Sequence, residues 1–139
     1  MAERTLAMIK PDAHAETEEI IRIVQEAGFV IIREKVMALV RDQVMIFYQE
    51  HQERPFFNDL GVHMVSGPVT VLVLERENAV QEWRDLMGAT NPANAKAGTI
   101  RARFAKPGDP IFKNVVHGSD SPEAARREIA MFFPGSGLA

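Results

Sequence analysis

A histidine stands among small and hydroxyl-bearing residues in the stretch NVVHGSDSPEAARRE, which covers positions 114–128. His117 follows two valines and precedes a Gly-Ser-Asp-Ser turn. An imidazole in such a place can be a nucleophile, a metal ligand or a hydrogen-bonded structural group. Ser121 followed by Pro122 is a typical helix start, and helix N-termini favour anions. The stretch therefore indicates an environment suited to an anion, but by itself it leaves the role of His117 open.

Glu128 lies inside the helix that is expected over 122–133. The apolar positions of this helix recur at helical spacing: Ala125, Ile129, Phe132 and Phe133. Glu128 therefore lies on or beside the apolar face, where a buried carboxylate needs a partner. It either reaches solvent at the edge of this face or packs back against the preceding strand. In the second case it accepts a hydrogen bond from His117, which orients the ring and leaves the other ring nitrogen free to react.

Spacing disfavours two other kinds of site. A serine hydrolase would use Ser119 or Ser121 with His117 and Asp120, but adjacency in sequence does not produce triad geometry, and no G-x-S-x-G turn occurs. The four histidines have no paired ligand spacing, H-E-x-x-H is absent and there is no cysteine, so no protein metal site is expected. Neither the G-x-x-x-x-G-K-[ST] nor the G-x-G-x-x-G phosphate loop is present.

Basic residues are concentrated in one segment of a chain whose net charge is −3. Between 96 and 113 a single acidic residue, Asp109, accompanies five basic ones: Lys96, Arg101, Arg103, Lys106 and Lys113. This local excess suits an anion such as a phosphate. Outside it, Lys10 follows an apolar strand and Arg84 lies on a helix, and each taken alone is typical of a solvated surface charge.

Hydrophobic periodicity predicts the elements that position these residues. Strands are expected over 5–9, 29–40, 69–75 and 114–117, and helices over 17–27, 41–50, 56–65, 78–87 and 122–133. The continuous run VTVLVLE is typical of a central buried strand. Residues 89–113 are expected to form a long ordered loop or small local turns, and loops of that length are usually functional. The order matches a split βαβ arrangement, βαββαβ, in which helices cover one face of an antiparallel sheet, so the expected class is α+β.

Composition limits the remaining possibilities. The chain has 139 residues, of which 46% are hydrophobic and 25% charged, as expected for one globular domain over 1–139. Its apolar runs are too short to cross a membrane, and its first residues lack the pattern of a signal peptide. We therefore expect a cytoplasmic location, in keeping with the absence of cysteine. The acidic balance disfavours nucleic acid as a partner.

Five segments together resemble nucleoside diphosphate kinases: TLAMIKPD, FYQEHQERPFF, SGPVTVLVLE, MGATNPANAKAGTIR and NVVHGSDSPEAARREIAMFF. They occur in the order of that family and span nearly the whole chain, and the pattern N-x-x-H-G-S-D-S is highly specific. The resemblance implies a ferredoxin-like βαββαβ fold and a ping-pong phosphotransferase. The γ-phosphate of a nucleoside triphosphate would pass to a histidine and then to a nucleoside diphosphate. The alternative is a catalytically altered nucleotide-binding or assembly module of the same fold.

The resemblance also implies roles for the reacting groups. The phosphate would bind Nδ1 of His117 while a neighbouring group holds Nε2. Glu128 matches the supporting glutamate of the family, and Ser119 matches the serine that accompanies it. Lys10 corresponds to the lysine that contacts the nucleotide sugar and the transferring phosphate, with Tyr48 beside it. An ammonium in that place suits the stabilisation of charge in a loose transition state.

The nucleotide contacts follow from the same resemblance. The base would stack on Phe56 with Leu60 nearby, which implies low base selectivity because stacking does not identify a base. Asn114 corresponds to the asparagine that binds the ribose hydroxyl. The groups that hold the phosphates correspond to Arg84, Thr90 and Arg101. A magnesium ion would bridge the β- and γ-phosphates without dedicated protein ligands.

Two segments depart from the family pattern. The stretch AHAETEE after Pro11 and Asp12 is shorter than usual. The segment AKPGDPIFK before Asn114 is longer, and Ile111 is expected to provide its apolar contact with the nucleotide. Members of the family commonly form tetramers or hexamers built from dimers, so the resemblance implies a homo-oligomer based on a dimer.

Overall fold

The structure is a computed structural model that describes residues 2–49, 53–55 and 57–139. Its strands (β), α-helices (α) and 3-10 helices (η) follow one another as β1 (Ala2–Ile9), η1 (Pro11–Glu16), α1 (Thr17–Glu26), β2 (Val30–Met37), α2 (Arg41–Phe47), α3 (Phe57–Met64), β3 (Val69–Glu77), α4 (Ala79–Met87), η3 (Pro92–Asn94), α5 (Ile100–Phe104), β4 (Val116–Gly118) and α6 (Pro122–Phe132). This order confirms the expected α+β class.

The strands form one antiparallel sheet in the order β2-β3-β1-β4. The long central pair β1 and β3 runs from Ala2 opposite Glu77 to Ile9 opposite Thr70. The short strand β4 lies on the other side of β1, where His117 is paired with Met8. The sheet therefore places the histidine on an edge strand, beside the end of β1 that leads to Lys10. This is the ferredoxin-like arrangement implied by the sequence.

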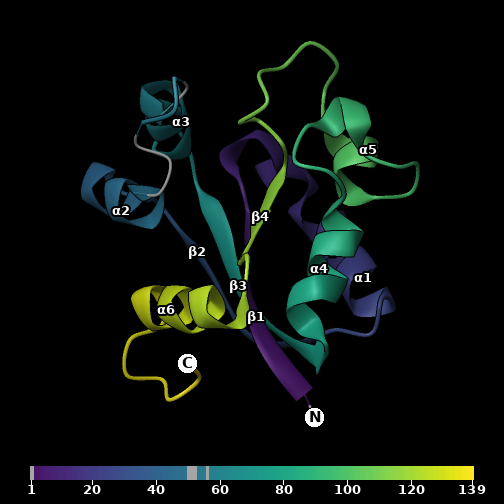
Figure 1. The fold of residues 1–139 in the computed structure, drawn as a ribbon, viewed down its shortest axis with the longest axis vertical. Coiled ribbons are helices and arrows are strands. Elements are labelled where there is room, and N and C mark those ends of the chain that lie inside the picture. Colours follow the sequence, from purple (N-terminus) through teal and green to yellow (C-terminus); the bar gives the residue numbers. More distant parts are fainter. Residues whose placement is uncertain (1, 50–52, 56) are drawn as a thin grey trace.

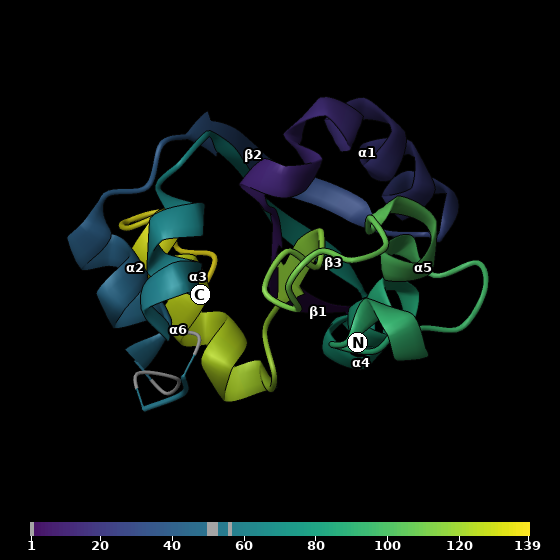
Figure 2. The same cartoon turned by 90° about the horizontal axis from the view of Figure 1, so that it is seen from above.

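Helices cover both faces of the sheet, so the expectation that they cover one face is wrong. Both views place α2, α3 and α6 on one side and α1, α4 and α5 on the other (Figures 1 and 2). The physical reason lies in the two central strands, which are apolar on both faces. In β1, Leu6 and Met8 belong to one buried cluster and Ala7 and Ile9 to the other. Alternate residues of a strand point to opposite faces, so both faces must be covered.

Each buried cluster joins strands and helices of one layer. The cluster under α1 and α4 includes Leu72, Leu74, Ile20, Val24 and Trp83. The cluster under α2, α3 and α6 includes Val71, Val73, Val44, Leu60, Met64 and Ile129. The cleft described below lies at the end of β1 where residues of both layers meet.

The helix starts and stops agree with the sequence where capping chemistry is explicit. The Ser121 side chain accepts a hydrogen bond from the Ala124 amide at 3.1 Å, as expected for the N-cap of α6. The expected loop over 89–113 contains a helix, α5, whose N-cap Thr99 accepts from the Ala102 amide at 3.3 Å. Strand β2 is shorter than predicted, ending at Met37 rather than 40. Over the described residues, no helix has the length and apolar character needed to cross a membrane.

Candidate active site

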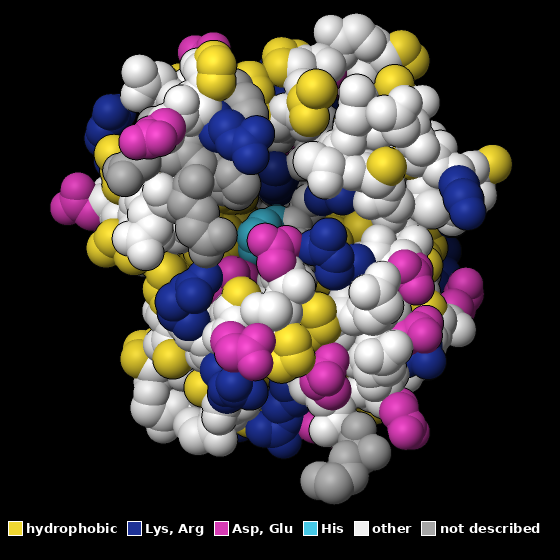
Figure 3. Space-filling model, in the orientation of Figure 1, with side chains coloured by type: hydrophobic (Ala, Val, Ile, Leu, Met, Phe, Trp, Pro, Cys, Tyr) yellow, Lys and Arg dark blue, Asp and Glu magenta, His cyan; other side chains and the backbone are white. Residues whose placement is uncertain are grey.

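A cleft at the end of β1 brings together residues that are far apart in the sequence. Its lining includes Lys10, Tyr48, Leu60, Arg84, Thr90, Arg101, Asn114 and His117. They come from both helical layers and from the segment before β4. The space-filling view shows a hollow in which a histidine is bordered by lysine, arginine and acidic side chains (Figure 3). The sequence-predicted residues therefore share one basic cleft, apart from Phe56, which lies outside the described residues, and two that lie behind His117.

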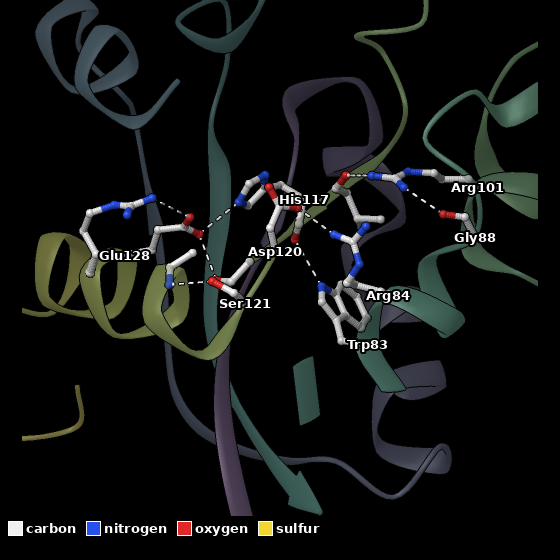
Figure 4. Close-up of polar contacts among 12 residues, drawn as sticks. Trp83, Arg84, Gly88, Arg101, His117, Asp120, Ser121 and Glu128 are labelled. Carbon is white, nitrogen blue, oxygen red and sulfur yellow. Dashed lines mark hydrogen bonds and ion pairs between the residues drawn. The ribbon is translucent and has the colours of Figure 1, made fainter. Parts of the chain in front are cut away.

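Of those two residues, Glu128 contacts the imidazole of His117, and Ser119 holds Glu128. Glu128 Oε1 lies 3.1 Å from His117 Nε2 and accepts a hydrogen bond from Ser119 Oγ at 2.9 Å (Figure 4). Glu128 is 7% exposed and Ser119 is fully buried, so the carboxylate packs inward and does not reach out to solvent. Because Nε2 is engaged, only Nδ1 can bind another group without breaking the contact with Glu128.

The backbone of β4 is fixed by a tryptophan on α4. Trp83 Nε1 donates a hydrogen bond to the carbonyl oxygen of His117 at 3.2 Å. An ideal Cβ placed on Gly118 would lie 2.4 Å from Cδ1 of the same indole. Gly118 lines the cleft, and its nearest side chain is that of Trp83. A side chain there would push β4 away from α4 and shift the histidine.

Lys10 lies at the end of β1 with its ammonium directed at the segment before β4. Its Nζ donates to Asn114 Oδ1 at 2.7 Å and to the carbonyl oxygen of Phe112 at 3.1 Å. Burial and the charge of Arg101 lower the pKa of Lys10 to about 7, against the opposing effect of Asp12. This pKa lies near neutral pH, so the lysine can gain or lose its charge there.

A strained turn separates Asn114 from His117. Val115 is fully buried and has a φ of 76°, a region that β-branched residues rarely adopt. The Val116 amide donates to the Asn114 carbonyl at 2.9 Å, which closes a γ-turn around Val115. The Val115 amide donates to Asp12 Oδ2 at 3.1 Å, and its carbonyl accepts from the Lys10 amide at 2.9 Å. The strained conformation of Val115 persists because Asp12 binds its amide and the Lys10 amide binds its carbonyl oxygen.

Arg101 has a larger structural role than the sequence predicted. Its guanidinium donates to the carbonyl oxygens of Asn114, Gly88 and Val116 at 3.0, 2.9 and 2.8 Å. Figure 4 shows the contact with Gly88. Burial, with a further contribution from the charge of Arg84, lowers its pKa to about 10, so the group stays charged at neutral pH. Arg101 joins α5 to the end of α4 and to both sides of the strained turn. Three of its five N–H groups donate to these carbonyl oxygens.

Arg84 and Thr90 lie on the other side of the cleft. Arg84 Nη1 lies 2.6 Å from Asp120 Oδ1, which ties α4 to the turn after His117 (Figure 4). The carbonyl oxygen of Thr90 accepts a hydrogen bond from Asn114 Nδ2 at 3.0 Å. The Arg84 side chain is partly exposed at the mouth of the cleft, where an incoming anion can reach it.

Tyr48 forms part of the wall around the histidine. Its ring centroid lies 5.9 Å from that of His117. The ring of Phe47 contacts both, with its centroid 4.6 Å from that of His117 and 4.8 Å from that of Tyr48. Burial and the charge of Glu128 raise the pKa of Tyr48, so it remains a neutral phenol. Ile111 and Phe112 line the cleft with Leu60, so the long segment before Asn114 supplies two apolar groups where one was expected.

Comparison with known proteins identifies the family. The family model described as nucleoside diphosphate kinase matches residues 3–138. The chain belongs to the nucleoside diphosphate kinase family. It is 53% identical to the nucleoside diphosphate kinase of Citrifermentans bemidjiense over 133 residues, which cover 94% of this chain and 95% of the relative.

Solved structures of nucleoside diphosphate kinases have the same fold. A crystal form of the Aquifex aeolicus enzyme matches with a TM-score of 0.91 and 38% identity, covering all of both chains. The Halobacterium salinarum enzyme, solved in complex with CDP, matches with a TM-score of 0.90 and 35% identity over 100% of this chain and 92% of that one.

Several residues around this nucleoside diphosphate kinase cleft were not predicted from the sequence. Asp12 and His63 form a pair with 2.9 Å between Oδ1 and Nε2, and Trp83 and Asp120 make the contacts described above. Of these, Asp12 and Asp120 had a local signal, since they lie in the quoted family segments TLAMIKPD and NVVHGSDSPEAARREIAMFF. The partners of the other residues lie between 34 and 51 positions away, beyond the reach of any local pattern.

Proposed function

We propose that this nucleoside diphosphate kinase transfers phosphate in two steps through a phosphohistidine at Nδ1 of His117. The observation that supports this most directly is the hydrogen bond between His117 Nε2 and Glu128, because it leaves Nδ1 as the free ring nitrogen in a basic cleft. Chemistry at a histidine also fits a cleft that contains no cysteine and no serine-hydrolase turn.

In the first step, the Nδ1 lone pair of His117 attacks the γ-phosphorus of a nucleoside triphosphate. The new N–P bond forms as the bond from phosphorus to the β–γ bridging oxygen breaks, and the electron pair leaves with the diphosphate. The diphosphate oxygen of an acceptor nucleotide then attacks the phosphohistidine, and the N–P bond breaks. Glu128 holds the proton on Nε2 and stabilises the charge that the ring gains during transfer.

Cationic groups in the cleft would stabilise the phosphates. Lys10, Arg84 and Arg101 line the cleft. Positioning and charge stabilisation account for most of phosphoryl-transfer catalysis, since the transition state is loose and carries charge on its peripheral oxygens. An anion beside Lys10 would restore the charge that burial disfavours, so substrate binding and the protonation of Lys10 are expected to be linked.

The sugar and base would occupy the part of the cleft near α3. Asn114 would bind the ribose hydroxyl, and Leu60 and Ile111 line the apolar side. The proposed stacking residue Phe56 lies next to the first residue of α3 in sequence. Apolar and stacking contacts do not identify a base, so low base selectivity is expected for both nucleoside triphosphates and diphosphates.

Magnesium would enter with the nucleotide. Within the described part of the chain, no three histidine or carboxylate side chains gather into a metal site. We therefore expect phosphate oxygens of the nucleotide and water molecules to be the ligands of the magnesium ion. When bound, the ion would neutralise phosphate charge, while Lys10 and the arginines act from the protein side.

We also propose a homo-oligomer based on a dimer, and a cytoplasmic location. Strand β2 is an edge of the sheet, and it exposes 58% of Val30 and 58% of Val36. An exposed apolar edge strand is suited to pairing with a second copy of the chain. Light scattering after size exclusion tests the oligomer, and Val36→Lys should shift the mass toward the monomer.

The phosphohistidine is tested with γ-labelled ATP and magnesium. The wild-type protein should acquire an acid-labile, base-stable label and pass it to an added nucleoside diphosphate, whereas His117→Ala should acquire none. Arg126→Ala, an exposed change on α6, serves as the matched control. Label on His117→Ala equal to the wild type would refute the assignment. Nucleotide binding without any exchange by the wild type would favour the alternative, a catalytically altered binding module.

A further inference from the structure

The side chains of His63 and Asp12 form a largely buried pair that has no role in the scheme above. His63 belongs to the last turn of α3, and Asp12 lies in η1, directly after Lys10 and Pro11. The 2.9 Å contact between Nε2 and Oδ1 joins side chains that are only 9% and 10% exposed. A buried carboxylate without a partner is costly, so this contact is expected to hold its two groups in place.

The carboxylate of Asp12 has two oxygens with two separate tasks. Oδ1 contacts His63, and Oδ2 accepts the amide hydrogen of Val115 at 3.1 Å. Val115 is the strained centre of the γ-turn; Asn114 directly precedes it, and Val116 connects it to His117. The orientation of the Asp12 carboxylate therefore determines whether the Val115 amide keeps its hydrogen bond to Oδ2.

Several neighbouring groups determine the pKa of Asp12. Burial acts to raise its pKa, but the hydrogen bond from His63, the charges of Lys10 and His63 and the Val115 amide outweigh burial and lower it. The carboxylate is therefore anionic and attracted by the ammonium of Lys10. His63 holds it on the Val115 side and leaves the lysine directed at Asn114.

The ring of His63 makes a second contact with the segment before β4. Its centroid lies 5.8 Å from that of Phe112, which lines the cleft and whose carbonyl oxygen accepts from Lys10. His63 thus contacts Asp12, which binds the strained turn, and Phe112, which lines the cleft.

We propose that His63 is a positioning residue for phosphoryl transfer, which fixes Asp12 on the Val115 amide and thereby places His117. This inference rests on the proposed function. It adds to that function a residue that touches neither the nucleotide nor the reacting nitrogen. The contribution of His63 should appear in the transfer rate more than in nucleotide affinity, because the bonds that it supports place the nucleophile.

Two substitutions separate the hydrogen bond from the ring. His63→Phe keeps an aromatic ring against Phe112 but has no donor for Asp12, whereas His63→Gln keeps an N–H donor near the position of Nε2 and loses the ring. Val62→Ala, an exposed change on the same helix, is the control. The rate of phosphoenzyme formation at saturating ATP is measured by rapid quench, and ADP affinity is measured by calorimetry.

The rate for His63→Phe should fall by about tenfold, the effect of one lost hydrogen bond to a charged acceptor. His63→Gln should recover most of that loss, and ADP affinity should change little in either variant. A rate for His63→Phe equal to that of the wild type, or equal losses in both variants, would overturn the proposal.

Hydrogen exchange at the Val115 amide provides a readout that does not depend on turnover. Exchange should be faster in His63→Phe than in the wild type and in His63→Gln, while amides in the middle of β3 stay unchanged. Unchanged exchange at Val115 in His63→Phe would also overturn the proposal. An inactive wild type with the expected exchange pattern would instead refute the proposed function and leave the link between His63 and Val115 standing.

Discussion

Removing the carboxylate of Glu128 should slow phosphoryl transfer without preventing nucleotide binding. Oε1 accepts from Ser119 and contacts His117 Nε2, and Glu128 does not line the cleft. Its effect on catalysis must therefore pass through the orientation and charge of the imidazole. Glu128→Gln keeps the shape and one acceptor oxygen, whereas Glu128→Ala removes both.

The magnitude follows from the two hydrogen bonds. A hydrogen bond to a charged group contributes about 1.5–3 kcal/mol, and about 1.4 kcal/mol corresponds to a tenfold change in rate. The amide oxygen of Glu128→Gln can still serve one of the two donors, so its transfer rate should fall by about tenfold. Glu128→Ala leaves neither interaction, and its rate should fall by about 100-fold.

Stability should also fall in Glu128→Ala, because the fully buried Ser119 hydroxyl loses its acceptor. An unsatisfied buried group costs about 1–3 kcal/mol. For a chain of this size the melting temperature should drop by about 4 °C for each kcal/mol. Ser119→Ala removes the donor as well as the bond and should be less destabilising than Glu128→Ala.

The assay is single-turnover phosphorylation of the enzyme by γ-labelled ATP, combined with calorimetric measurement of the ADP dissociation constant. We expect the transfer rate to fall in the order wild type, Glu128→Gln, Glu128→Ala, with ADP affinity nearly constant. An unchanged transfer rate in Glu128→Ala would refute the orienting role. A large loss of ADP affinity at full transfer rate would show that Glu128 acts on the nucleotide instead.

Two further predictions concern the cationic groups of the cleft. Burial and the charge of Arg101 lower the pKa of Lys10 from 10.5 to about 7. Between these two pH values Lys10 binds a proton in the unfolded chain but not in the folded protein. Lys10 should therefore make the free energy of unfolding rise with pH from about 7 to 10.5. Urea unfolding at several pH values should show that rise, and Lys10→Met should lack it. Arg101→Lys should lower stability by about 2 kcal/mol or more, because an ammonium cannot reach the three carbonyl oxygens that the guanidinium fork joins. A melting temperature equal to that of the wild type would contradict this reasoning.

Local patterns predicted most elements because their causes are local. The continuous apolar run and β-branching of β3, the Ser121 cap and the apolar face of α6 each depend on residues within a few positions. Helix α5 was missed because only five residues, Ile100–Phe104, form it, too few for a periodic pattern. Its cap, Thr99, was the available signal. The second covered face of the sheet could have been inferred from VTVLVLE, because a strand that is apolar throughout is buried on both sides.

The site was predicted in part. Family resemblance named Lys10, Arg84, Arg101, Asn114 and His117, and the structure places them around one cleft. The pairing of His117 with Glu128 was foreseeable from helical spacing, but spacing could not decide whether the carboxylate faces the ring or the solvent. The contact at 3.1 Å decides it.

The sequence by itself determined the strands and helices, the family and the identity of the groups available for chemistry, because these depend on residue type and near-neighbour spacing. The tertiary structure alone decided how these groups are oriented. Asp12 meets the Val115 amide 103 positions away and His63 51 positions away, and Arg101 binds the carbonyl oxygens on both sides of a strained turn. Such contacts depend on the packing of β1, α3 and α5 around β4, and no local pattern records which buried donor will face which acceptor.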